Sequence, residues 1–201
     1  MAIVTMVLGE SGTGKSTSLR NLDPSKTLLI QSVKKPLPFR SSDWKVLDKQ
    51  GDGNIYVKDD AARICSMLSR CPHDVIVIDD SQYIMANEFM RGVTDSAKGN
   101  EQFMKFNRIA HNMWAVINTA ASLPDNKRVY ILSHTQTDEH GKTKIKTIGK
   151  LLDEKITLEG MVSIVVRTQV VNGKYSFITQ NNGNDTVKTP MEMFESELID
   201  N

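Results

Sequence analysis

The sequence is poor in cysteine, in excess charge and in long apolar runs. Its two cysteines, Cys65 and Cys71, form no CxxC motif and have no histidine pair nearby, so the sequence predicts neither a zinc site nor a disulfide framework. The formal net charge is +1, which excludes a global basic field of the kind that holds nucleic acid. Any contact with nucleic acid must therefore come from a local patch.

The sequence also lacks the signals of a membrane or secreted protein. No apolar run approaches the ~20 residues that a membrane-spanning helix needs. The apolar start, residues 1–8, has no basic segment before it and no small-residue cleavage site, so we do not interpret it as a signal peptide. We therefore expect no membrane association and a cytoplasmic location.

Short apolar runs alternate with helical patterns along the chain. Runs rich in β-branched residues predict buried strands over 3–8, 27–30, 75–78 and 129–132. Helical spacing and end signals predict helices over 15–22, 61–69, 82–90 and 101–123. This alternation predicts one α/β domain, residues 1–201, built as a three-layer sandwich around a mainly parallel sheet.

The C-terminal third departs from that alternation. Asn172-Gly173 separates two β-rich runs, 161–171 and 174–180, and predicts a type I′ hairpin that adds an antiparallel edge to the sheet. Residues 151–158 are expected to form a short helix. Residues 180–201 are expected to be a polar tail that ends in another short helix.

The long helix predicted over 101–123 has one apolar face. Because its large apolar residues recur at helical spacing, we interpret them as core rather than as a ligand site. They are Phe103, Phe106, Ile109, Ala110, Met113, Trp114 and Ile117.

Residues 9–16 read GESGTGKS and match the phosphate-binding pattern G-x-x-x-x-G-K-[ST] at every fixed position. Glycines allow a tight turn whose backbone N–H groups face phosphate oxygens, and the helix that follows would direct its positive end at the same anion. We expect Lys15 to reach the β- and γ-phosphates of ATP and Ser16 to ligate Mg²⁺. The predicted nucleotide-binding residues are Gly9, Glu10, Ser11, Gly12, Thr13, Gly14, Lys15, Ser16 and Thr17.

Two acids follow the buried run 75–78. We interpret Asp79 as the Walker B aspartate, which holds Mg²⁺ through water. Ligands of open α/β sheets bind beyond the carboxyl ends of the strands, so Asp79 and the P-loop should share one crevice. For Asp80 two interpretations stay open: it orients the attacking water, or it caps the helix that begins near Ser81.

Ser133-His134 follows the next predicted strand and should lie beside the γ-phosphate. A hydrogen bond from His134 would sense that phosphate, whereas the simpler interpretation is a polar residue that ends a strand. The predicted location favours sensing. The residues predicted to take part in catalysis are thus Lys15, Asp79, Asp80 and His134.

A lysine-rich segment comes directly after His134. Three interpretations compete: contacts with nucleic-acid phosphates, a residue that reaches a neighbouring subunit's nucleotide, or a solvated loop. Arg167, within a β-rich run, is a further candidate for the trans-acting role. The lysines concerned are Lys142, Lys144, Lys146 and Lys150.

The combination of GESGTGKS, VIVIDDSQ and ILSHTQ with this basic loop resembles RecA-fold P-loop ATPases. The stretches KKPLPF, IDDSQYIMANEFMR and KIKTIGKLLDEKITLEG are similar to those of small ATP-binding proteins of tailed bacteriophages, and the resemblance covers nearly the whole chain. It implies a RecA-like sandwich, a Mg²⁺-dependent ATPase, self-association as a hexamer, ring or filament, and action on single-stranded DNA in recombination, annealing or replication. For a phage protein, the expected location is the host cytoplasm.

One departure from that family concerns the catalytic acid. RecA-like enzymes usually carry a glutamate just after the second strand, whereas residues 29–33 read LIQSV. This raises Asp80 as a substitute and keeps slow or absent hydrolysis open.

Three other functions compete with a DNA-linked ATPase. A small-molecule or nucleoside kinase would need a cationic lid, and the 92–100 loop offers only Lys98. A GTP switch would carry an N/T-K-x-D element, and none follows the Walker B strand. A non-hydrolysing nucleotide-binding adaptor is supported by the missing glutamate.

Overall fold

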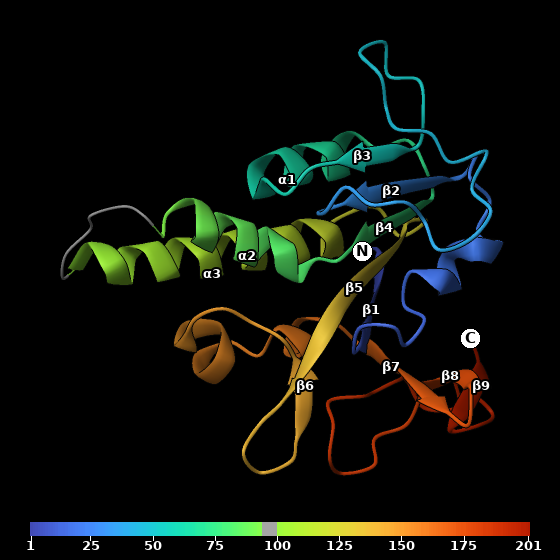
Figure 1. Ribbon diagram of the computed structural model, residues 1–201, viewed down its shortest axis with the longest axis vertical. Helices are drawn as coiled ribbons and strands as arrows, with labels where there is room; N and C mark the ends of the chain where they lie inside the picture. The colour runs from blue at the N-terminus through green and yellow to red at the C-terminus, as the bar shows by residue number, and fades with distance from the viewer. Residues whose placement is uncertain (94–99) are drawn as a thin grey trace.

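The computed structural model describes residues 1–93 and 100–201. Within these residues a nine-stranded sheet follows the order β3-β2-β4-β5-β1-β7-β8-β9, with β6 paired to β5 (Figure 1). The strands are β1 (Ile3–Gly9), β2 (Thr27–Gln31), β3 (Ile55–Val57), β4 (Val75–Asp79), β5 (Arg128–Thr137), β6 (Thr143–Ile145), β7 (Ile164–Val171), β8 (Lys174–Ile178) and β9 (Leu198–Asp200).

The pairing confirms the predicted fold class, a RecA-like P-loop sandwich. Strands β3, β2, β4, β5, β1 and β7 are parallel. Strand β8 continues the sheet antiparallel to β7, and β9 pairs antiparallel to β8. Asn172 and Gly173 both have positive φ, 51° and 76°, as the predicted type I′ hairpin between β7 and β8 requires. Strand β5 lies between β1 and β4, so one strand separates the P-loop strand from the Walker B strand.

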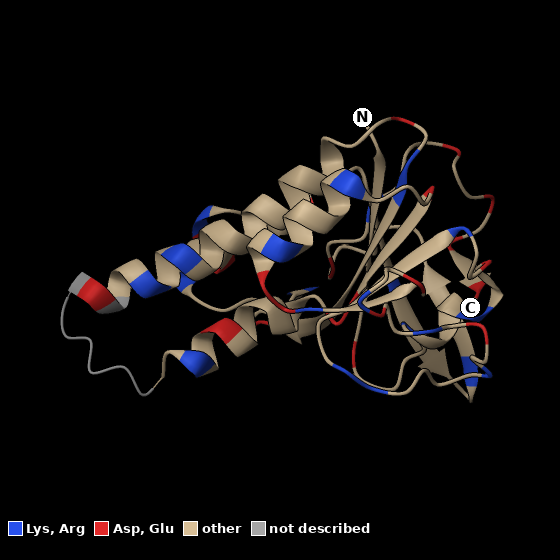
Figure 2. Cartoon of the chain, turned by 90° about the horizontal axis from the view of Figure 1, so that it is seen from above, with Lys and Arg blue, Asp and Glu red and all other residues tan. Residues whose placement is uncertain are grey.

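Three α-helices cover one face of the sheet: α1 (Ala61–Arg70), α2 (Gln82–Arg91) and α3 (Asn100–Ala121). Helices α2 and α3 run side by side and extend beyond the sheet (Figures 1 and 2). Asp60 caps α1 as predicted, because its carboxylate accepts a hydrogen bond from the backbone N–H of Arg63 at 2.9 Å. None of the helices in the described ranges has the length and apolarity of a membrane span.

The other face of the sheet is covered by shorter pieces. A 3-10 helix, η1 (Thr17–Asn21), and the segment 32–53 pack there, and Trp44 of that segment is buried. Neighbouring residues of β1 consequently face two different cores, with Met6 against the helices and Val7 against η1. A strand that is buried on both faces reads as a continuous apolar run, which is why its position could be predicted.

The predicted helix over 15–22 is wrong, since only the five-residue η1 forms there. The hydroxyl of Ser18 donates a hydrogen bond to the carbonyl oxygen of Lys15 at 2.6 Å, the oxygen that an α-helix would pair with the N–H of Leu19. The N–H of Leu19 bonds instead to the carbonyl of Ser16 at 3.3 Å, the tighter 3-10 pattern.

Three further expectations for the second half of the chain need correction. The end of the tail is not a helix but β9, whose residues pair with β8. The helix expected over 151–158 is divided into a one-turn π-helix, η2 (Leu151–Lys155), and a 3-10 helix, η3 (Leu158–Met161). Strand β5 does not end at Leu132 but continues to Thr137, because its last three residues pair with β6.

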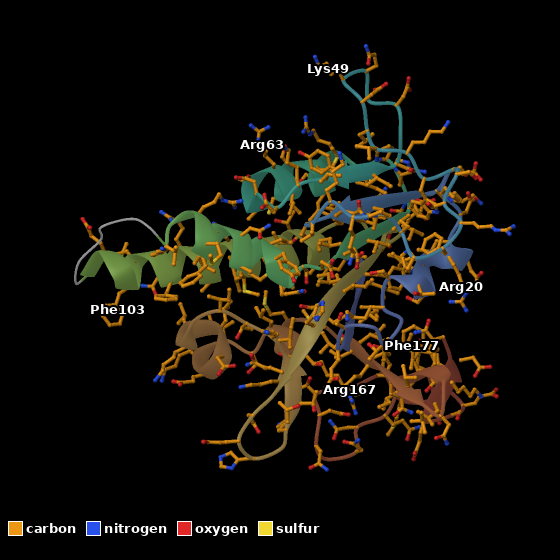
Figure 3. The ribbon with its side chains drawn as sticks, viewed as in Figure 1. Arg20, Lys49, Arg63, Phe103, Arg167 and Phe177 are labelled. Carbon is orange, nitrogen blue, oxygen red and sulfur yellow. The ribbon has the colours of Figure 1, made fainter. Side chains whose placement is uncertain are left out.

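The apolar stripe of α3 is only partly core. Ile109, Met113 and Ile117 are fully buried, whereas Phe103 is 74% exposed and Trp114 is 38% exposed. Figure 3 shows Phe103 at the far end of α3, beyond the sheet. Helical spacing identified the face, but the first turns of the helix extend past the elements that could cover it.

We predict that Ile109→Ala lowers the free energy of unfolding by about 2–5 kcal/mol, because it leaves a cavity between α3 and the sheet. Phe103→Ala, a larger truncation on the same helix, should cost less than about 1 kcal/mol, since its ring is mostly in water. Chemical denaturation of both variants checks the pair. Equal losses would contradict the exposure of Phe103.

Candidate functional site

The two predicted motifs meet at the carboxyl edge of the sheet. The hydroxyl of Ser16, in the P-loop, donates to both carboxylate oxygens of Asp79, each 3.0 Å away. A cavity of about 460 Å³ opens beside this contact. Its lining residues come from the P-loop, from η1, from the residue after β4, from the middle of β5, from the segment after β2 and from the C-terminal segment: Ser11, Gly12, Gly14, Lys15, Ser16, Thr17, Arg20, Lys35, Pro38, Asp80, His134, Tyr175 and Asn201.

The P-loop is held in shape by close contacts with β7. A Cβ on Gly9 would lie 1.9 Å from the hydroxyl oxygen of Thr168, so only glycine fits there. The hydroxyls of Thr13 and Thr168 are 2.6 Å apart, and that of Thr168 also donates to the carbonyl of Leu8 at 3.2 Å. Gly14 has φ +97°, a conformation that favours glycine. Thr168 was not predicted as a site residue, and no local signal in the sequence marks it.

Lys15 lies inside the loop that precedes it. Its ammonium group donates to the carbonyls of Gly9 at 2.8 Å and Glu10 at 2.7 Å, and its side chain is buried. Burial lowers the pKa of Lys15 to about 8, although the carboxylates of Asp80 and Asp79 act in the opposite direction. The predicted α-helix dipole is weak here because η1 is short, so backbone N–H groups and this cation supply the positive field.

Asp79 ends β4 and is 1% exposed. Burial and the neighbouring Asp80 carboxylate raise its pKa, while Lys35 and the Ser16 hydroxyl counteract them. The oxygens of Ser16 and Asp79 fit Mg²⁺, which takes one or two protein oxygens and completes its shell with phosphate and water. Across residues 1–93 and 100–201, no group of three His, Cys, Asp or Glu residues forms a metal site by itself.

Asp80 does not cap α2. The N-cap of that helix is Ser81, and no side-chain hydrogen bond caps it. Asp80 instead has φ 56°, which is unusual for a residue other than glycine, and its carboxylate turns into the cavity. There it forms an ion pair with Lys35, and one of its oxygens lies 3.6 Å from Nε2 of His134. The structure therefore favours the interpretation of Asp80 as a site residue.

His134 lies opposite Gly9 in the register of β5 and β1, where the parallel pairing of these strands ends. Its ring lines the cavity, and burial together with the charge of Lys15 lowers its pKa, so the imidazole is neutral at pH 7. The side chain of Gln82 accepts a hydrogen bond from the His134 backbone N–H at 3.2 Å. The predicted sensor thus sits at the cavity wall, although β5 does not end there.

The lysine-rich segment lies around β6, which pairs with the end of β5. Lys142, Lys144 and Lys146 alternate with residues that face the opposite way, of which Ile145 is buried. Lys144 forms an ion pair with Asp153 at 2.8 Å, which raises its pKa, whereas Lys142 and Lys146 are exposed. Lys150 is also exposed and lies 4.0 Å from Glu154.

Arg167 is already engaged within its own chain. Its guanidinium group donates to the fully buried carboxylate of Asp185 at 3.2 and 3.3 Å. Breaking this pair would leave a buried charge without its partner. Such a change lowers the free energy of unfolding by several kcal/mol in buried pairs. The trans-acting role therefore has less support at Arg167 than at the exposed lysines.

Lys35 and Arg20 are charged cavity residues that sequence reasoning missed, and of the two Lys35 contacts the acids. Lys35 belongs to the stretch KKPLPF, which has no periodicity and follows β2 by four residues, so nothing local indicated where its side chain goes. Cys65 and Cys71 are both free thiols. Lys98, weighed as part of a kinase lid, lies outside the described residues.

We predict that nucleotide binding takes up protons near pH 9. Lys15 without nucleotide has a pKa of about 8, so it is mostly neutral at that pH, and bound phosphates raise its pKa and recharge it. Affinity should fall up to tenfold per pH unit above pH 8. Calorimetry with EDTA in buffers of different ionisation enthalpy measures the uptake.

The matched control is Lys15→Arg, because a guanidinium stays charged at this pH and removes the uptake. Identical apparent enthalpies in all buffers for the unmodified protein would contradict the low pKa of Lys15.

Comparisons with known proteins find a likeness to solved structures. No protein-family model matches the chain, and no curated protein matches it either. The genome packaging NTPase B204 from Sulfolobus turreted icosahedral virus 2, solved in complex with ATP-gammaS, is similar with a TM-score of 0.40 and 9% sequence identity. The likeness covers 85% of this chain and 76% of that one. The chain has the P-loop fold on the evidence of its own sheet order and of the Ser16–Asp79 contact.

Proposed function

We propose that this protein binds ATP with Mg²⁺ and hydrolyses it, as a RecA-like ATPase of phage type. The observation that carries the proposal is the contact between Ser16 and Asp79, with both oxygens of the carboxylate 3.0 Å from the hydroxyl. Two motifs 63 residues apart in the sequence converge on one point beside a cavity of about 460 Å³, a size suited to a small-molecule ligand.

Each residue of this site has a distinct part in the proposed reaction. The P-loop N–H groups and Lys15 hold the β- and γ-phosphates, and Ser16 and Asp79 hold Mg²⁺, which neutralises charge on the β- and γ-oxygens when bound. Asp80 lines the same cavity and is the acid available to orient a water for attack. His134, neutral and 3.6 Å from Asp80, can donate or accept a hydrogen bond at the γ-phosphate.

The finer part of the proposal is action on single-stranded DNA by a self-associated form, a hexamer, ring or filament, in recombination, annealing or replication. It is supported by the resemblance of the phage-type stretches and by the exposed lysines beside β6. These lysines follow directly from the strand that carries His134, so a DNA contact there would lie one short segment from the nucleotide.

A non-hydrolysing adaptor is the second candidate. It is favoured by the stretch 29–33, which has no acid where RecA-like enzymes usually carry a glutamate and in which Gln31 ends β2. Gln31 pairs in register with Asp79 but brings no carboxylate. Tight ATP binding without turnover would select this function.

Steady-state hydrolysis of ATP tests the proposal. We expect Mg²⁺-dependent turnover that single-stranded DNA stimulates, and we expect Lys15→Ala and Asp79→Asn each to reduce it by at least ~100-fold, as loss of a group that stabilises transition-state charge does. Asp74→Asn, at the opposite end of β4, is the control. Full turnover in Lys15→Ala would refute the phosphate assignment, and unchanged Mg²⁺ dependence in Asp79→Asn would refute its metal role.

The lysine segment has a separate test in the salt dependence of DNA binding. Replacing Lys142 and Lys146 by glutamine should flatten the slope of log K against log salt by roughly 0.7 for each lost phosphate contact. Replacing Lys45 and Lys49, which are both exposed, changes the net charge equally and should leave the slope unchanged. Figure 3 shows Lys49 at the far end of the molecule. Equal slopes for both double variants would assign the segment to solvent.

A further inference from the structure

Two acids and two lysines meet at the mouth of the nucleotide cavity. Lys35 forms an ion pair with Asp80, its Nζ lies 3.9 Å from Oδ2 of Asp79, and its side chain is 37% exposed. Lys15 and Lys35 both line the cavity, and the charge of each lowers the pKa of His134. Only Lys15 belongs to the P-loop. Lys35 therefore brings a second cation to the Walker B side of the site.

The backbone of Lys35 is held firmly while its side chain reaches into the cavity. The side-chain amide of Gln31 donates a hydrogen bond to the backbone carbonyl of Lys35 at 3.1 Å. The backbone N–H of Ser32 donates to the carbonyl of Asp79 at 3.2 Å. Pro36 follows directly and restricts Lys35 to an extended backbone. Gln31, which ends β2, thus has a structural part, because its side chain anchors the backbone of Lys35.

A triphosphate needs a cation at this position more than a diphosphate does. Ser16 and Asp79 would hold Mg²⁺, which would supply positive charge to the terminal phosphates, so a γ-phosphate would lie on the side of Asp79 and Asp80. Two carboxylates at that end repel the additional charge. A diphosphate that stops at the β-phosphate lacks this additional charge and would meet Lys15 and the P-loop N–H groups first.

We propose that Lys35 recognises the γ-phosphate of a nucleoside triphosphate by exchanging its partner Asp80 for that phosphate. This inference rests on the proposed nucleotide-binding function and deepens it. The exchange makes the site discriminate triphosphate from diphosphate. It also releases the carboxylate of Asp80, which can then accept a hydrogen bond from a water beside His134.

Binding of ADP and of a non-hydrolysable ATP analogue, each measured by calorimetry with Mg²⁺ and with EDTA, tests the inference without turnover. The unmodified protein should prefer the triphosphate. Lys35→Met should weaken the analogue about 10- to 100-fold more than ADP, the range for a hydrogen bond to a charged group. Lys34→Met removes the neighbouring exposed lysine and should leave the preference unchanged.

A double variant separates recognition from simple repulsion. Lys35→Met leaves Asp80 unpaired near the phosphates, whereas Lys35→Met with Asp80→Asn restores the net charge of the cavity. The lost preference should persist in the double variant, and its full recovery would overturn the inference. Lys35→Gln, checked by thermal unfolding, provides a second variant if the methionine perturbs folding.

The outcomes also distinguish this inference from the proposed function. If the unmodified protein binds both nucleotides and Lys35→Met weakens them equally or not at all, the inference fails while the nucleotide site stands. If the unmodified protein binds neither nucleotide, the proposed function itself fails.

Discussion

The burial of two adjacent carboxylates is the constraint on which the site depends. Asp79 and Asp80 are 1% and 5% exposed, and taking such charges out of water is costly unless cations and hydrogen-bond donors surround them. Ser16, Lys15, Lys35 and His134 supply those partners from the P-loop, from the segment after β2 and from β5. The groups that offset the cost of burying these carboxylates therefore also form a polar cavity with positively and negatively charged walls.

The sheet order brings these partners together. With β5 between β1 and β4, the point at which the parallel pairing of these three strands ends presents a glycine loop, a histidine and two acids along one edge. Ligands of open α/β sheets bind at this edge because the strand ends leave a crevice between diverging loops. Because η1 is short, it contributes less positive charge at a bound phosphate than an α-helix would. The lysine side chains are therefore more important here.

What the sequence could predict follows from how local each signal is. The P-loop, Asp79 and the central strands were predicted because fixed spacing or a continuous apolar run marks them within a few residues. Lys35 and Thr168 were not predicted, because tertiary packing alone brings them to the site; Thr168 contacts Thr13 from 155 residues away. The helix over 15–22 failed for a local reason that propensity does not show, the hydroxyl of Ser18 at the Lys15 carbonyl. In α3, periodicity predicted which face is buried, but it did not predict the point along the helix at which other elements stop packing against that face.

Strand β5 changes partners along its length: it is parallel to β1 up to His134 and antiparallel to β6 from Thr135. The carbonyl of His134 also accepts the backbone N–H of Lys146 at 2.8 Å. The cavity wall and the lysine segment are consequently joined through main-chain atoms, with no adjustable side chain between them. Because each peptide unit is planar and stiff, the main chain alone sets where the backbone of Lys146 lies relative to that of His134.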